Sequence, residues 1–185
     1  MKLIIVRHGE TIGNTKKVLQ GKSEGKLTEK GVIQAKELGK QLKDKHKVDM
    51  VFCSPLGRCV ETLNNILEEY PIDGEILMSN LLEERDFGEY TGLEGHMVDW
   101  DEINKESKIN KEMGVESWSE VQKRADLFLE DLKLEDDGKT VLVVSHAGPI
   151  KAMINKLKNE SLDYKEIIVK NGQIIEFDYK TELEF

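Results

Sequence analysis

The chain has 185 residues and a mass of 21.1 kDa, a size suited to one domain with a substantial core. Its net charge of −9 argues against general binding to nucleic acids or to anionic membrane surfaces, since both need a basic face. The longest apolar runs, such as residues 3–6 and 141–144, are far too short to span a bilayer, so we expect no membrane segment and no nucleic-acid partner.

The two cysteines, Cys53 and Cys59, form neither a CxxC motif nor a disulfide framework. Such cysteines are typical of a reduced protein, which predicts a cytoplasmic location. No repeat, low-complexity tract or linker divides the sequence, so we interpret residues 1–185 as a single domain.

Short apolar runs alternate with helical periodicity, which is the pattern of an α/β fold with a mostly parallel sheet. Residues 3–6 predict the first strand, and Thr28 is a good N-cap for the helix that follows. Residues 50–53 predict the second strand. Ser54 and Pro55 come next and form a favourable cap and first turn for another long helix.

The second half of the chain continues this alternation. Residues 76–78 predict a short third strand. Residues 93–117 lack a clear period, and we interpret them as an irregular, partly helical and variable cap segment over the active site. Apolar residues then recur with helical spacing over 118–132. Residues 140–144 predict an interior strand, and a helix should begin near Pro149.

The C-terminal part departs from the alternation of strands and helices. Residues 167–169 and 174–177 flank Asn171-Gly172, which is a strong signal for a β-hairpin. The sheet should therefore finish with an antiparallel edge strand. Together these elements predict a three-layer α/β/α fold with a mostly parallel central sheet and an antiparallel edge strand.

Three predicted strands end in polar or charged segments, at residues 7–10, 54–58 and 145–148. Each segment has an alternative explanation when it is considered alone. Residues 7–10 would be a solvated loop, Arg58 an exposed residue of a helix turn, and His146 a histidine at the edge of the core. The carboxyl ends of parallel strands line a common crevice, however, so the three segments can meet. Two arginines and two histidines beside helix N-termini suit a phosphoryl dianion, which favours a site over three separate explanations.

The four histidines show no metal-binding spacing. There is no HExxH motif, and His8, His46, His96 and His146 lack paired helical spacing. We therefore expect a site that uses neither a metal ion nor another cofactor.

Five segments resemble, in order and spacing, the signatures of the histidine phosphatase superfamily, also called phosphoglycerate mutase-like. RHGETIGN at residues 7–14 resembles RHGxTxxN, and SPLGRCVET at 54–62 resembles SPLxRAxxT. Residues 21–35 resemble GxxDxPLTxxGxxQA, residues 82–88 resemble LxExxFG, and residues 145–148 resemble SH(G/A)G. The resemblance spans residues 4 to about 150. It implies the phosphoglycerate mutase-like fold and is greatest to the small phosphatase or α-ribazole phosphatase-type branch.

The resemblance implies a role for each catalytic residue. His8 would attack phosphorus and form a phosphohistidine. Arg7, Arg58 and His146 would hold the non-bridging oxygens of the phosphoryl group. Glu84 would protonate the leaving group and then activate water. Substrate-binding roles fall on Asn14, Gly21, Ser23, Arg85 and Ala147.

Two neighbouring acids are candidates for the general acid. Aligned on Phe87-Gly88, the resemblance places the family's general acid on Glu84 and not on Glu83, which we assign to solvent or structure. Glu84 must be protonated in the first step, and a bound phosphate nearby favours that form by charge repulsion.

The leading interpretation is a phosphomonoesterase for a small phosphorylated metabolite. A cofactor-dependent phosphoglycerate mutase is the alternative: the resembling mutases have Tyr and Lys where this chain has Phe87 and Gly95, although they share Arg85. A phosphohistidine phosphatase acting on proteins stays open as well, whereas the presence of His8 and Glu84 argues against a non-catalytic binding module. The sequence leaves open the physiological substrate and whether the protein forms a homodimer.

Overall fold

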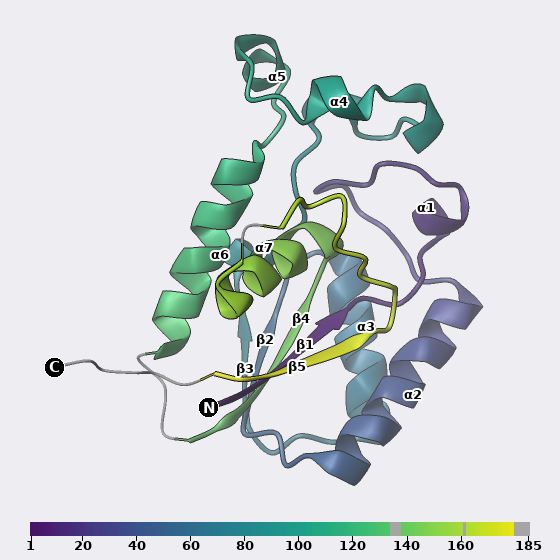
Figure 1. Ribbon diagram of the computed structural model, residues 1–185. Coiled ribbons are helices and arrows are strands. Elements are labelled where there is room, and N and C mark those ends of the chain that lie inside the picture. Colours follow the sequence, from purple (N-terminus) through teal and green to yellow (C-terminus); the bar gives the residue numbers. More distant parts are fainter. Residues whose placement is uncertain (134–137, 161, 180–185) are drawn as a thin grey trace, which may run out of the picture.

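The computed structural model describes residues 1–133, 138–160 and 162–179. At its centre is a five-stranded sheet with the order β3-β2-β4-β1-β5 (Figure 1). The strands are β1 (Lys2–Arg7), β2 (Met50–Cys53), β3 (Glu75–Met78), β4 (Thr140–Ser145) and β5 (Ile174–Asp178). The first four are parallel to one another, and β5 pairs antiparallel with β1. The predicted mostly parallel sheet with an antiparallel edge strand is confirmed.

Helices cover both faces of this sheet. The α-helices are α1 (Ile12–Thr15), α2 (Glu29–Lys45), α3 (Gly57–Glu69), α4 (Trp100–Ile103), α5 (Lys108–Glu112), α6 (Trp118–Lys133) and α7 (Ala147–Lys158). Short 3₁₀ turns are η1 (Asn80–Leu82), η2 (Gly88–Tyr90) and η3 (Gly95–Met97). α2 and α3 pack on one face, and α6 and α7 pack on the other (Figure 1). This is the three-layer architecture that the sequence predicts.

Alternate residues of β1 enter two different cores. Leu3 and Ile5 belong to the cluster that contains Phe128 of α6, whereas Ile4 and Val6 belong to the cluster formed with α2 and α3. Successive side chains of a strand point to opposite faces, so a strand covered on both faces needs an uninterrupted apolar run. β1 is therefore anchored in the centre of the protein, and the residues at its carboxyl end start from a rigid base.

The starts of the first two long helices show one confirmed and one incorrect prediction. α2 follows Thr28, whose hydroxyl accepts a hydrogen bond from the N–H of Gly31 at 3.0 Å, as predicted. α3 begins only at Gly57, and Ser54 does not cap it. The Ser54 hydroxyl instead lies 2.8 Å from Nε2 of His146. The side chain that looked like a helix cap therefore belongs to the polar cluster at the strand ends.

The predicted hairpin near the C-terminus is only partly present. Residues 171 and 172 do form a turn, and β5 follows it. Residues 167–169 form no strand, however, and β5 pairs with β1 instead. The carbonyl of Val169 accepts a hydrogen bond from Arg7 at 2.6 Å, so this stretch contributes to the strand-end cluster rather than to the sheet.

The segment 93–117 is irregular and partly helical, as predicted, and contains η3, α4 and α5. α4 and α5 lie at the top of Figure 1, away from the sheet. Val98, Ile103 and Val115 pack with Leu19 in a small core of their own. α7 begins two residues before Pro149, which lies in its first turn. In the described part of the chain, no helix has the length and apolar character needed to cross a membrane.

Candidate active site

The carboxyl ends of β1, β2 and β4 meet at one edge of the sheet. The strand register places Arg7 opposite Ser145 and Cys53 opposite Val144. One further backbone hydrogen bond of 3.1 Å joins the N–H of His8 to the carbonyl of Ser145. The structure thus brings together the three strand ends that the sequence predicts to converge.

His8 is almost fully buried, with 2% of its surface exposed. Its Nδ1 lies 2.8 Å from the carbonyl oxygen of Gly9, and because a carbonyl only accepts, Nδ1 carries the proton. Nε2 then holds the lone pair, and no residue that the structure describes bonds to it. Burial lowers the pKa of His8 to about 3, and the charges of Arg7 and Arg58 add to the effect. The ring is therefore neutral at pH 7 and suited to nucleophilic attack.

Arg58 comes from the first turn of α3 and is 1% exposed. Its Nη1 and Nη2 donate to the carbonyls of Ser23 at 2.8 Å and Gly21 at 2.7 Å. Its Nε donates to Nδ1 of His146 at 3.1 Å. Burial lowers the pKa of Arg58, and the nearby Glu84 carboxylate raises it. Three hydrogen bonds in the plane of the guanidinium therefore fix its orientation.

Arg7 ends β1 and brings a second guanidinium to the same place. Its Nη1 donates to the carbonyl of Val169 at 2.6 Å. Its Nε is buried and has no hydrogen-bond partner within the described residues. Leaving such a donor unsatisfied costs roughly 1–3 kcal/mol, so a ligand oxygen that approached it would be stabilised.

His146 packs against His8, with ring centroids 5.1 Å apart and ring planes at 60°. Because Arg58 donates to Nδ1, the ring proton lies on Nε2, which donates to the hydroxyl of Ser54 at 2.8 Å. Burial, followed by the charge of Arg58, holds the pKa of His146 well below its ordinary value. Both ring nitrogens are thus bonded to protein groups, and a direct contact of His146 with substrate stays a prediction.

The neighbouring acids Glu84 and Glu83 have different surroundings. Oε1 of Glu84 accepts hydrogen bonds from the N–H groups of Arg85 and Gly148, both at 2.9 Å. No described residue bonds Oε2, which leaves this oxygen available for a proton. Glu83 instead forms an ion pair with Lys22 at 3.1 Å. Glu84 therefore lines the same cavity as Arg7, His8 and Arg58, whereas Glu83 does not, and the role of Glu84 as general acid stays a prediction.

These groups line a cavity of about 330 Å³. Its charged side is formed by Arg7, His8, Arg58 and Glu84. Its apolar lining includes Val18, Leu19, Phe87 and Trp100, which come from the stretch after α1, from the stretch before η2 and from the start of α4. The cavity therefore combines anion-binding groups with an apolar wall.

Asn14 also lines the cavity, and the oxygen of its side-chain amide is already bonded. Its Oδ1 accepts hydrogen bonds from the N–H of Thr11 and from Nδ2 of Asn171, each at 3.1 Å. The Asn14 amide NH₂ is thus left to donate to a ligand. Sequence analysis missed Asn171, which also donates to the carbonyl of His8 at 3.0 Å. Its only sequence signal was that of a turn, and no spacing relates it to the first motif.

The remaining predicted substrate-binding residues differ in position. Gly21 lines the cavity, with φ at +49° and its carbonyl bonded to Arg58. Ser23 does not line it, and its hydroxyl donates to the carbonyl of Gln20 at 2.5 Å. Ala147, the first residue of α7, does not line it either.

Arg85 lies outside the cavity and is 2% exposed. Its Nε and Nη2 donate to the carbonyls of Glu116 at 2.7 Å and Ile103 at 3.0 Å, and its Nη1 donates to Oδ1 of Asn104 at 2.7 Å. Its guanidinium carbon also lies 4.8 Å from the ring centroid of Trp118. Arg85 therefore connects the segment 93–117 to the rest of the protein, a role that no sequence motif indicated.

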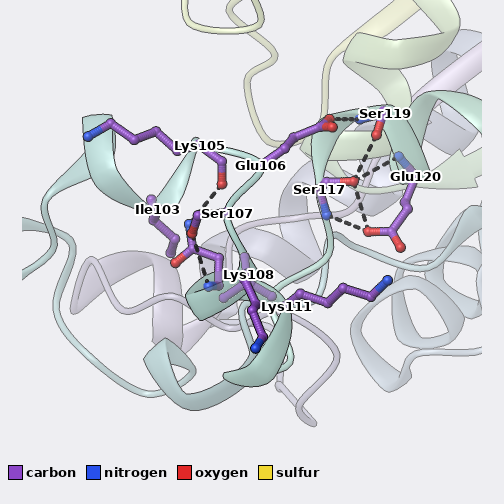
Figure 2. A pocket seen from close by; sticks show the side chains of 11 residues that line it. Ile103, Lys105, Glu106, Ser107, Lys108, Lys111, Ser117, Ser119 and Glu120 are labelled. Atoms are coloured by element: carbon purple, nitrogen blue, oxygen red, sulfur yellow. Dashed lines mark hydrogen bonds between the residues drawn. The ribbon is translucent and has the colours of Figure 1, made fainter.

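A second cavity, of about 380 Å³, lies between α5 and the start of α6 and contains none of the predicted site residues (Figure 2). Several of its polar groups are bonded to neighbouring protein groups. Oε1 of Glu106 accepts from the N–H of Ser119 at 3.2 Å, and Ser117 donates to Glu120 at 2.8 Å. Lys105 forms an ion pair with Glu102 at 2.6 Å. This cavity therefore lacks the free nucleophile and the buried cations that distinguish the first.

No metal-binding cluster accompanies the site. Over residues 1–133, 138–160 and 162–179, no group of three or more His, Cys, Asp or Glu side chains is placed to hold an ion.

Comparisons with known proteins agree with this geometry. The family model of the histidine phosphatase superfamily (branch 1) matches residues 3–183. Phosphoserine phosphatase 1 of Hydrogenobacter thermophilus is 33% identical, over 83% of this chain and 74% of its own length. A 2,3-bisphosphoglycerate-dependent phosphoglycerate mutase of Bradyrhizobium diazoefficiens is 34% identical, over 89% of this chain and 86% of its own length.

Solved structures share the fold over nearly the whole chain. The α-ribazole phosphatase of Shigella flexneri superposes with a TM-score of 0.82 and 24% identity, covering 97% of this chain and 91% of the other. A mutant phosphoserine phosphatase of Entamoeba histolytica, in complex with phosphoserine, superposes with a TM-score of 0.80 and 29% identity, with the same coverage.

Proposed function

Because the chain belongs to the histidine phosphatase superfamily (branch 1), we propose that it hydrolyses a small phosphorylated metabolite through a phosphohistidine intermediate and without a metal ion. Relatives that include phosphoserine phosphatases support phosphatase activity. We further propose that the enzyme works in the cytoplasm, as its two buried, unpaired cysteines suggest.

The observation that carries this proposal is the state of His8. Its Nδ1–H is bonded to the carbonyl of Gly9 and its pKa is lowered to about 3, so Nε2 offers a lone pair throughout the neutral range. A neutral imidazole attacks phosphorus, whereas an imidazolium cannot. His8 follows directly after the buried strand β1 and lines the cavity, so its ring starts from a rigid base.

The two arginines supply the charge that a phosphoryl group requires. Arg58 is fixed by three hydrogen bonds, and Arg7 has a buried Nε without a partner among the described residues. The Asn14 amide adds a neutral donor. Charge that develops on the equatorial oxygens in the transition state would be stabilised by groups already in position.

In the first step Nε2 of His8 forms a bond to phosphorus while the bond from phosphorus to the substrate oxygen breaks. Glu84 gives its proton, held on Oε2, to that oxygen, and an alcohol leaves. In the second step a water molecule attacks phosphorus, its proton passes to Glu84, and the phosphorus–nitrogen bond breaks. Inorganic phosphate forms, and both residues return to their initial states.

A phosphoglycerate mutase is the second candidate, because mutases are among the relatives with 34% identity. A mutase holds substrates with a second phosphate or a carboxylate and therefore needs additional positive charge. Arg85 is the residue shared with mutases. Its guanidinium donates hydrogen bonds to carbonyls of the segment 93–117, and the residue lies outside the cavity. This arrangement favours the phosphatase.

The size of the cavity favours a small substrate over a phosphorylated protein. Its volume of about 330 Å³ lies at the low end of the range of ligand sites, roughly 300–1,000 Å³. We therefore place phosphohistidine-containing proteins behind phosphorylated metabolites as substrates.

Release of inorganic phosphate from a panel of phosphorylated metabolites tests the proposal, with and without EDTA. We expect hydrolysis of several small phosphomonoesters at rates that EDTA leaves unchanged. With 3-phosphoglycerate and catalytic 2,3-bisphosphoglycerate, we expect little 2-phosphoglycerate. Loss of activity on chelation would contradict metal independence, and isomerisation much faster than phosphate release would favour the mutase.

A further inference from the structure

The side-chain amide of Asn171 connects the C-terminal part of the chain to the first motif. Its Nδ2 donates hydrogen bonds to the carbonyl of His8 at 3.0 Å and to Oδ1 of Asn14 at 3.1 Å. A longer bond, of 3.3 Å, joins it to the carbonyl of Gly9. Asn171 itself does not line the cavity. It therefore contacts two residues of the proposed reaction without being placed to contact the substrate.

The orientation of this amide follows from its partners. A backbone carbonyl only accepts hydrogen bonds, so the NH₂ group of Asn171, and not its oxygen, faces His8 and Gly9. The Asn14 oxygen faces Thr11 for the converse reason, because the backbone N–H of Thr11 only donates. Asn171 adds a second donor to this oxygen. The Asn14 amide is thus held at its oxygen by one local and one distant group.

The turn that carries Asn171 is bonded to the end of β1 through its backbone as well. The N–H of Gly172 donates to the carbonyl of Arg7 at 3.1 Å. The carbonyl of Gly9, which accepts the longer bond from Asn171, is also the group that holds the Nδ1 proton of His8 at 2.8 Å. The Asn171 side chain is therefore anchored to the same backbone that carries the proposed nucleophile.

We infer that Asn171 is a positioning residue for phosphoryl transfer, which fixes the Asn14 amide relative to His8. The inference rests on the proposed function, because it assigns a further role in the same reaction. An NH₂ group has two protons, so one points to the Asn14 oxygen while the carbonyls of residues 8 and 9 share the other. A donor to the phosphoryl group stabilises the transition state most when it is already in place, and Asn171 supplies this preorganisation.

A role in the turn alone makes a different prediction. The side chain of Gln173 belongs to the same turn, and its Oε1 accepts a hydrogen bond from the N–H of Lys170 at 2.8 Å. Its side chain bonds none of the described residues 8, 9 and 14. Removing it weakens the turn but leaves the hydrogen bonds of Asn171 in place. Gln173→Ala is therefore the matched control for Asn171→Ala.

A single turnover of p-nitrophenyl phosphate, with enzyme in excess, tests the inference, because nitrophenolate release reports phosphoryl transfer without a proton donor. We expect Asn171→Ala to slow this release about tenfold, within the roughly hundredfold that a misplacement of about 1 Å can cost. Asn171→Asp has nearly the same shape but replaces the donor by a carboxylate, so it should lose at least as much. Gln173→Ala should retain the wild-type rate.

A double-mutant cycle with Asn14→Ala shows whether Asn171 acts through the Asn14 amide. In the Asn14→Ala background, Asn171→Ala should slow nitrophenolate release by less than about threefold, because the amide that it positions is gone. Asn171→Asp serves in the same cycle and should give the same result.

Three outcomes would overturn the inference while hydrolysis by the wild type upheld the proposed function. They are an equal slowing in both backgrounds, a wild-type rate in Asn171→Ala or Asn171→Asp, and an equal loss in Gln173→Ala. Failure of the wild type to hydrolyse p-nitrophenyl phosphate or any other phosphomonoester would overturn the proposed function and this inference with it.

Discussion

The Nε of Arg58 donates a hydrogen bond of 3.1 Å to Nδ1 of His146, so two side chains predicted to hold the phosphate are bonded to each other. The bond assigns the ring proton of His146 to Nε2, which donates to Ser54 at 2.8 Å. A buried row of three polar groups therefore extends from β2 to the guanidinium. Fully satisfied networks of this kind fix side-chain orientation.

We expect His146→Ala to act by loosening Arg58. Vanadate mimics the trigonal-bipyramidal transition state, and the variant should bind it at least about tenfold more weakly. The reason is that the guanidinium loses the acceptor of one hydrogen bond, and a hydrogen bond to a charged group contributes about 1.5–3 kcal/mol. The vanadate inhibition constant measures this loss. In an Arg58→Ala background the same substitution should cost little more. Additive losses in the double variant would show that His146 contacts the ligand independently of Arg58.

Glu84→Gln should slow phosphoryl transfer from an alkyl phosphate about 10²- to 10⁴-fold, because an alkoxide needs a proton to leave. Transfer from p-nitrophenyl phosphate should fall much less, since its leaving group is stable as an anion. Single-turnover kinetics separates this step from the later hydrolysis. Glu83→Gln is the control and should retain both rates, as its carboxylate pairs with Lys22. Equal losses on the two substrates would exclude Glu84 as the acid.

His8 makes stability depend on pH in a defined direction. Its pKa is about 3 in the folded protein and about 6.5 when unfolded, so between these values the unfolded state binds the additional proton. The free energy of unfolding therefore rises with pH across this window, by at most about 1.4 kcal/mol per pH unit for this group. Denaturant unfolding from pH 4.5 to 7 should show a shallower slope in His8→Asn. His96→Asn, at an exposed histidine, is the control, and an unchanged slope in His8→Asn would contradict the assigned burial effect.

Arg85→Met should destabilise the protein rather than weaken substrate binding selectively. The substitution leaves the buried carbonyl of Ile103 and the partly buried carbonyl of Glu116 without their donor, whereas the Asn104 oxygen keeps the indole N–H of Trp118, so we expect the free energy of unfolding to fall by about 2–4 kcal/mol. Denaturant unfolding measures this fall, and Lys108→Met, on the exposed face of α5, is the control. A raised KM with unchanged stability would instead indicate that Arg85 binds the substrate.

The parts of the fold that depend on local sequence were predictable. The apolar run of β1 and the Thr28 cap of α2 each carry enough information within a few residues. The three strand ends were also predictable as a group, because the carboxyl ends of parallel strands share one edge of a sheet. The family resemblance then assigned His8 and Glu84, and the structure places both in one cavity.

The residues whose contacts the sequence did not predict all bond to distant segments of the chain. Ser54 has the chemistry of a helix cap, but its hydroxyl forms a hydrogen bond with His146, which lies far along the chain. Arg85 follows the acidic motif directly, yet its donors are used by carbonyls of the cap segment. Asn171 looked like a turn residue and bonds Asn14. Hydrogen-bonding partners of this kind follow from the tertiary fold and leave no periodic signal in the sequence.

Trapping the covalent intermediate tests the central claim most directly. The enzyme is mixed with a ³²P-labelled phosphomonoester, quenched within milliseconds and digested, and the labelled peptide is identified. We predict an acid-labile, alkali-stable label on His8 that His8→Ala abolishes. With labelled p-nitrophenyl phosphate, whose leaving group needs no proton, Glu84→Gln should accumulate this label, since the second step loses its base. A label on His146, or steady release of inorganic phosphate with no labelled protein at any quench time, would contradict the account.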